Sequence, residues 1–166
     1  MKRKLKYKRV IMVSIIFVFI IIIVIYMYMN RRHDYEYTGA IQTYTASYRQ
    51  DDKVYTFDLK AFEKAGIQYV SLNDMYNMVV ILDKNTKVYL NYNQHVMTYE
   101  LTNQTYLFDY GHDKIVYNNK CIEFNNKDEH IYVSHKNIYI SVFLTEKLLL
   151  NNEKKLTFEN KNAIIQ

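Results

Sequence analysis

A run of apolar residues extends from position 10 to position 29 without a charged side chain, and Ser14 is its only strongly polar member. At ~1.5 Å of rise per residue, about twenty apolar residues cross the roughly 30 Å hydrocarbon core of a bilayer. Only a helix satisfies its own backbone there, so the pattern predicts a transmembrane helix although Ile and Val favour strands. The side chains that mark this anchor are Val10, Ile16, Phe19, Ile23 and Met29.

The charges beside the apolar run predict its orientation. Six basic residues and no acidic residue precede it, namely Lys2, Arg3, Lys4, Lys6, Lys8 and Arg9. A short basic flank stays in the cytoplasm, so residues 1–9 are expected inside and the long C-terminal part outside. A cleaved signal peptide is the alternative, but its apolar region is normally shorter and small residues precede its cleavage site. We therefore expect a single-pass signal anchor in a cell membrane.

Beyond the anchor, the clearest pattern is a repeat of strand, helix, turn and strand. Residues 69–72 (Tyr-Val-Ser-Leu) recur as residues 139–142 (Tyr-Ile-Ser-Val). A helical pattern follows each copy, then a polar turn at 83–87 or 151–155 and a short strand at 88–90 or 156–158. Ser71 and Ser141 are expected to cap the two helices, and Asp74 completes a capping box in the first. The series predicts two related structural units.

The helical segments of the two units differ in their apolar faces. In the first unit one apolar face recurs at helical spacing, made of Leu72, Met75, Tyr76 and Val79. In the second unit the same places hold Val142, Thr145, Glu146 and Leu149. Phe143 and Leu144 broaden this second stripe, so the second helix is expected to be buried on two sides.

The other segments predict mostly strands. Apolar or alternating patterns indicate strands at 96–101, 105–108, 114–117, 121–124 and 131–134. Asn118 and Asn119 are a two-residue hairpin signal, because Asn tolerates positive φ. A short helix is expected from an N-cap at Asp58 through Leu59, Phe62 and Ala65, with Gly66 as its left-handed stop.

These elements define the expected organisation of the chain. Residues 30–52 are expected to form a juxtamembrane spacer that contributes an edge strand at 41–48. Residues 53–160 are expected to form a two-layer α+β domain. Its expected elements are a mostly antiparallel sheet and two or three short helices. Residues 161–166 are expected to be a tail.

Composition narrows the class of protein. The formal net charge of the chain is +5, and the six basic residues before the anchor contribute +6 of it. The rest of the chain therefore carries a net charge of about −1, which gives no support for a nucleic-acid partner. The single cysteine, Cys121, excludes an intramolecular disulfide. The absence of proline and the excess of Asn, Lys, Ile and Tyr are typical of an AT-rich genome and, with the anchor, suggest a Gram-positive bacterium.

The repeat resembles the paired motif of the copper-amine-oxidase N-terminal-like, or stalk, domains of bacterial envelope proteins. The resemblance covers residues 69–158, and its motif positions are Tyr69, Ser71, Leu72, Asp74, Asp83, Lys87, Tyr139 and Ser141. Ser replaces both prolines of the family motif, Asn119 replaces its hairpin glycine, and its tryptophan is absent. The resemblance implies a spacer or adhesive module without amine oxidase activity, because the copper and quinone cofactor of that family belong to a separate catalytic domain.

Several side chains qualify as candidate sites. Asp109, His112 and Asp113 have types that suit a divalent metal, but with Gly111 they also suit a turn, which we favour. His130 and His135 are expected on opposite sides of a strand. Glu123, Asp128 and Glu129 are candidate paired acids for glycan hydrolysis, but a solvated loop is the favoured interpretation. Cys121 is expected to be a buried or edge thiol rather than a nucleophile.

Tyrosine is abundant enough to suggest a binding surface. Ten tyrosines stand out before and within the predicted domain, at positions Tyr35, Tyr37, Tyr44, Tyr48, Tyr89, Tyr92, Tyr99, Tyr106, Tyr110 and Tyr117. Their rings can stack on sugars or anchor a partner, but cross-strand packing explains them as well and is favoured.

The sequence thus predicts a non-enzymatic, membrane-anchored extracytoplasmic module that binds a wall polymer or an envelope protein. No catalytic residue and no cofactor is predicted. A small envelope hydrolase that uses Asp109, His112 and Asp113 is one alternative. A bitopic assembly or regulatory subunit that acts through its transmembrane helix is another.

Overall fold

The computed structural model describes residues 2–29, 31–32, 34–150 and 153–166. The chain divides into two compact units, residues 1–32 and 33–166. The first contains α1 (Lys2–Met29), whose stretch Ile11–Tyr28 is long and apolar enough to cross a membrane. A helix of this kind near an N-terminus serves as a signal anchor or as a signal sequence. The predicted helical state of the apolar run is confirmed.

The larger sheet of the second unit contains eight strands of the described residues. These are β1 (Tyr35–Glu36), β2 (Gln42–Gln50), β3 (Lys53–Lys64), β4 (Ile67–Ser71), β10 (Tyr132–Ser134), β11 (Asn137–Ser141), β12 (Leu156–Glu159) and β13 (Asn162–Ile165). Their order across the sheet is β1-β10-β11-β4-β3-β2-β13-β12. β1 lies parallel to β10 and β13 lies parallel to β2, whereas the other neighbours are antiparallel.

The second sheet is an antiparallel meander of five described strands in chain order. These are β5 (Lys87–Asn91), β6 (Val96–Leu101), β7 (Gln104–Asp109), β8 (Lys114–Tyr117) and β9 (Lys120–Ile122). Asn118 and Asn119 form the predicted hairpin turn between β8 and β9, with φ values of 43° and 66°. The predicted α+β class and mostly antiparallel pairing are confirmed, with two sheets in place of one.

The strands of the two repeat units are neighbours in the larger sheet. Tyr139 pairs with Ser71 and Ser141 pairs with Tyr69, so β4 and β11 run antiparallel through the matching tetrapeptides. Each strand leads into a helix, α2 (Leu72–Leu82) or α3 (Val142–Leu148). Both predicted caps are confirmed: Ser71 Oγ accepts the Asp74 N–H at 3.2 Å, and Ser141 Oγ accepts the Leu144 N–H at 3.1 Å.

The two units diverge after their helices. β5 enters the second sheet, whereas β12 stays in the first. Asp83 follows α2, and its carboxylate accepts hydrogen bonds from Thr102 N–H at 2.6 Å and Asn85 N–H at 2.9 Å. These bonds favour the ionised form and lower the pKa of Asp83. Part of the second predicted polar turn, residues 151–152, lies outside the described residues.

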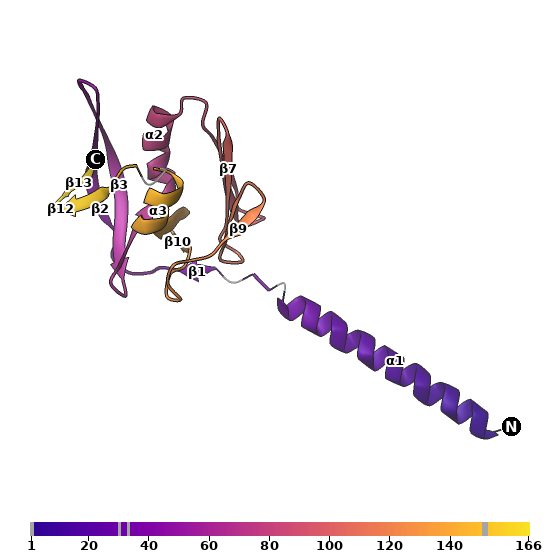
Figure 1. The fold of residues 1–166 in the computed structure, drawn as a ribbon. Helices are drawn as coiled ribbons and strands as arrows, with labels where there is room; N and C mark the ends of the chain where they lie inside the picture. Colours follow the sequence, from indigo (N-terminus) through magenta and orange to yellow (C-terminus); the bar gives the residue numbers. More distant parts are fainter. Residues whose placement is uncertain (1, 30, 33, 151–152) are drawn as a thin grey trace. The chain divides into compact units, whose positions relative to one another are not determined.

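One core joins both sheets and both helices. Figure 1 shows α2 and α3 between strand β3 of the larger sheet and strand β7 of the second. The buried side chains come from both sheets and both helices, for example Leu59 and Ile140 from the larger sheet, Met75 and Leu144 from the helices, and Phe108 from the second sheet. The domain therefore has sheet-on-helix-on-sheet packing, with three layers in place of the two that were predicted.

Two predictions for the start of the domain are wrong. Residues 58–64 continue β3 and form no helix, because side chains at alternate positions (Tyr55, Phe57, Leu59 and Ala61) point into the core along the strand. Gly66 does have positive φ, at 75°, but in the β3–β4 hairpin turn. The strand expected at 41–48 is also no edge strand, since β2 lies between β3 and β13.

Three smaller differences concern the helices and the C-terminus. Tyr76, expected on the buried face of α2, is 39% exposed, and Met78 is buried in its place. Phe143, expected to widen the buried stripe of α3, is also exposed, whereas Leu144 is buried. Residues 162–165, expected in a tail, form β13 inside the larger sheet.

Candidate binding pocket beside the first strand

Residues 34–41, here called the strap, are the first part of the domain that the structure describes. The strap contains β1, whose Tyr35 and Glu36 pair with Tyr132 and Val133 of β10. Its next residue, Tyr37, donates its backbone N–H to the Val133 carbonyl at 2.9 Å. The expected spacer therefore contributes the strand at one edge of the larger sheet.

Aromatic stacking holds the strap against the sheet. Beneath it lies a cluster of four buried rings, namely Phe62, Tyr69, Tyr132 and Tyr139. Tyr37 stacks on Phe62 with 3.7 Å between ring centroids, and Tyr35 stacks on His130 at 3.9 Å. Both strap rings also meet Tyr132 edge-on. The packing role favoured for the tyrosines is confirmed for Tyr35 and Tyr37.

Two histidine–carboxylate pairs connect the strap region to the second sheet. His95 Nδ1, in the turn between β5 and β6, lies 2.7 Å from Asp34 Oδ1. His130 Nδ1 lies 2.6 Å from Asp113 Oδ2, and Asp113 Oδ1 accepts the Ile131 N–H at 2.7 Å. Asp113 has a positive φ of 50°, which turns its carboxylate toward residues far along the chain. Each carboxylate thus orients a histidine beside the strap.

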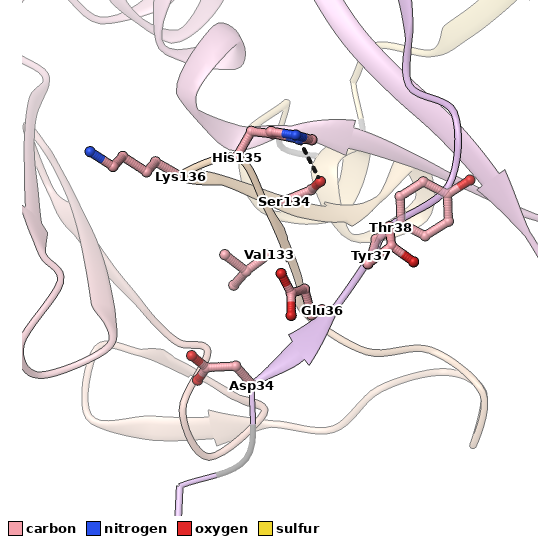
Figure 2. Close-up of a pocket in the computed structure, with 8 residues that line it drawn as sticks. All are labelled: Asp34, Glu36, Tyr37, Thr38, Val133, Ser134, His135 and Lys136. Carbon is pink, nitrogen blue, oxygen red and sulfur yellow. Dashed lines mark hydrogen bonds between the residues drawn. The ribbon is translucent and has the colours of Figure 1, made fainter.

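An open pocket of about 620 Å³ lies between the strap and the tight turn that joins β10 to β11. One wall is made of strap residues, and the other of Val133, Ser134, His135 and Lys136. Figure 2 shows the carboxylate of Glu36 facing the β10 side and the Lys136 side chain extending away from the strap. His135 Nδ1 lies 3.1 Å from Ser134 Oγ.

The chemistry of this strap pocket is polar and carries charges of both signs. Asp34 and Glu36 supply carboxylates, Lys136 supplies an ammonium, and Thr38 and Ser134 supply hydroxyls. The Glu36 side chain is exposed. Side chains of these types bind polar and charged groups through hydrogen bonds and ion pairs. Val133 and the ring of Tyr37 add apolar surface to the same walls.

The predicted metal candidates do not form one site. Asp109 accepts the His112 N–H at 3.1 Å and lies 2.9 Å from His112 Nδ1, whereas the Asp113 carboxylate contacts His130 and Ile131. Within the described residues no three His, Cys, Asp or Glu side chains gather as a metal would require. The favoured turn is confirmed, since residues 110–113 join β7 to β8.

Of the three predicted acids, Glu129 has a structural role, and the solvated loop expected there is wrong for this residue because its side chain is buried. The buried Glu129 carboxylate accepts the Ser141 hydroxyl and the Asn125 N–H, the latter at 2.9 Å. Glu123 is exposed in the segment after β9. Cys121 is exposed on β9, an edge strand, which agrees with the predicted edge thiol.

The tyrosines divide into buried and exposed groups. Tyr99, Tyr106 and Tyr110 are buried, whereas Tyr89 and Tyr92 are each 51% exposed. Burial raises the pKa of Tyr106 to about 12, with the neighbouring Tyr117 as a second cause. Tyr139 is fully buried, and among the described residues its Oη is the buried side-chain oxygen with no hydrogen-bond partner.

Sequence reasoning missed the strap pocket because its two walls are far apart in the chain. Residues 34–38 and 133–136 carry no shared motif, and only the β1–β10 pairing brings them together. Comparison of the chain with protein-family models, with curated proteins and with solved structures finds no match.

Proposed function

We propose that this chain is a membrane-anchored extracytoplasmic module, not an enzyme, that binds a polar partner in the cell envelope through the strap pocket. The observation that carries the proposal is the position of the pocket in the chain. Its first wall residue, Asp34, follows the end of the apolar helix α1 at Met29 by five positions. A partner bound there is linked to the anchor through a short stretch of chain.

The basic flank and the apolar helix support the membrane side of this proposal. The six basic residues before the apolar run of α1 favour a cytoplasmic N-terminus and therefore an exported domain. The wall of bacteria and the outer faces of envelope proteins present the hydroxyl, amide, carboxylate and ammonium groups that the pocket residues complement. The module then keeps its partner close to the bilayer.

The test compares retention of the full chain in detergent micelles on purified cell wall and on immobilised envelope proteins. In the pocket variant Glu36→Gln/Lys136→Ala we expect retention to fall at least about tenfold, because two charged contacts are lost. The matched control is Glu100→Gln/Lys87→Ala, which removes the same charges from exposed cross-strand partners on β5 and β6.

Each outcome bears on the proposal. Wall retention with the expected loss identifies a polymer partner, and protein retention with that loss identifies a protein partner. Absence of retention on both supports would reject the proposal. An equal loss in the control variant would also reject it, because the strap pocket would then have no special role.

A further inference from the structure

The strap is attached to the domain far more weakly than the strand that follows it. None of the residues 34–41 is buried. Its ladder with β10 has two residue pairs, whereas β2 has nine pairs with β3 and four with β13. Segments with few buried contacts and short ladders open locally at a much lower free energy than the core does. The weakly attached strap therefore ends where the strongly paired strand β2 begins, at Gln42.

The attachments of the strap reach three separate elements. Asp34 contacts His95 in the β5–β6 turn, Tyr35 stacks on His130 before β10, and Tyr37 stacks on Phe62 of β3. Because these strap residues are close in sequence, a break in the two-residue ladder removes them together. Release of the strap is therefore a single cooperative step.

Gly39 lies against the ring of Tyr37 and affects how the strap docks. A Cβ atom at position 39 would lie 2.5 Å from the Tyr37 Oη, so only glycine lets that ring fold back over the chain. In this position the Tyr37 hydroxyl donates to the Ala40 carbonyl at 3.3 Å. Substitution of Gly39 would push the ring away from its place on Phe62.

We infer that the strap is a latch: it docks on β10 and releases as a unit while β2, β3 and the core stay folded. Four of the eight residues that line the strap pocket belong to the strap, so the pocket is complete only when the latch is docked. The regulatory meaning of this step rests on the proposed function. Since the apolar helix joins the domain through the strap, tension on the anchor opens the latch and dismantles the pocket.

Hydrogen exchange of the full chain in nanodiscs, followed by mass spectrometry without any partner, tests the latch. We expect the Tyr37 amide to exchange at least about 100-fold faster than the protected amides of β2 and β3. Gly39→Ala should speed exchange at Tyr37 by a further factor of about ten and leave β2 and β3 unchanged. Gly66→Ala is the matched control, because it alters the β3–β4 turn and should leave exchange at Tyr37 as in the wild type.

Equal exchange rates at Tyr37 and in the β2–β3 ladder would overturn the inference, because the strap would then open only with global unfolding. An equal acceleration of strap and ladder in Gly39→Ala would overturn it as well. These measurements involve no partner. A negative result in the retention experiment would therefore not count against the latch. A negative result in the exchange experiment would not count against binding at the strap pocket.

Discussion

The Oδ1 atom of Asn73 accepts the backbone N–H of Ile138 at 3.0 Å, although the two residues are 65 positions apart. The bond joins the first turn of α2, in one repeat unit, to strand β11 of the other. Phe143 holds the matching place at the start of α3, and its side chain has no hydrogen-bond acceptor, so it returns no such bond. The paired units have therefore specialised, and the first supplies the link between them.

Loss of this link should cost stability. Asn73→Ala removes the acceptor and leaves the Ile138 N–H buried without a partner, which we expect to lower the free energy of unfolding by about 1–3 kcal/mol. Urea unfolding of the full chain in detergent measures the change. Asn77→Ala on the exposed face of the same helix is the control, with an expected change below about 0.5 kcal/mol. Equal effects of the two substitutions would contradict the assigned role.

The two helix caps should differ in their contributions to stability. Ser71→Ala removes a cap alone and should cost about 1 kcal/mol. Ser141→Ala also deprives the buried Glu129 carboxylate of a hydroxyl donor, so we expect a loss of about 2–4 kcal/mol. The comparison uses the same urea titration. Equal losses in the free energy of unfolding of the two variants would show that the bond from Ser141 to Glu129 adds no stability.

Buried tyrosines should make the domain sensitive to alkali. Burial, with Asp74 as a second cause, raises the pKa of Tyr139 from its ordinary value of 10.0 to about 12. The unfolded chain loses this proton first, so the stabilisation is complete below pH 10 and is lost as the pH rises toward 12. Urea midpoints measured across this range should fall steadily.

The variant Tyr139→Phe isolates the contribution of that hydroxyl. Because the Tyr139 Oη has no hydrogen-bond partner, we expect no loss of stability at neutral pH and a smaller decline in alkali. Tyr89→Phe, at an exposed position, is the control and should decline like the wild type. A clear loss at neutral pH in Tyr139→Phe would show that the hydroxyl has a partner.

The single cysteine reports membrane orientation. Cys121 is exposed on β9, so a membrane-impermeant maleimide should label it in intact cells if the domain is outside. In a Cys121→Ser background, Lys4→Cys should be labelled only after lysis, because position 4 lies in the basic flank before the apolar run. Labelling of Cys121 that requires lysis would place the domain in the cytoplasm and reject the extracytoplasmic assignment.

Local signals in the sequence predicted much of this fold. The capping serines and the Asn118–Asn119 turn depend on residues within a few positions of one another, and both were predictable. β3 was not, because Leu59, Phe62 and Ala65 have helical spacing while the ladder with β2 selects the strand alternation. Long-range pairing overrides a short helical pattern.

The candidate site was less predictable, for the same physical reason. Asp109, His112 and Asp113 are close in sequence, but the left-handed backbone at Asp113 turns its carboxylate toward His130. The strap residues gain their pocket only through β10. Neither relationship leaves a periodic or compositional trace, since each depends on which distant strand becomes a neighbour.

The β1–β10 pairing also has a consequence for the order in which the molecule is made. Tyr35 and its partner Tyr132 are 97 positions apart, and synthesis runs from the N-terminus. The helix and the strap therefore leave the ribosome long before the strand that receives them. Contacts between such distant segments form late in folding. We expect each new molecule to begin with an open latch, and the strap pocket to be the last part of the domain to mature.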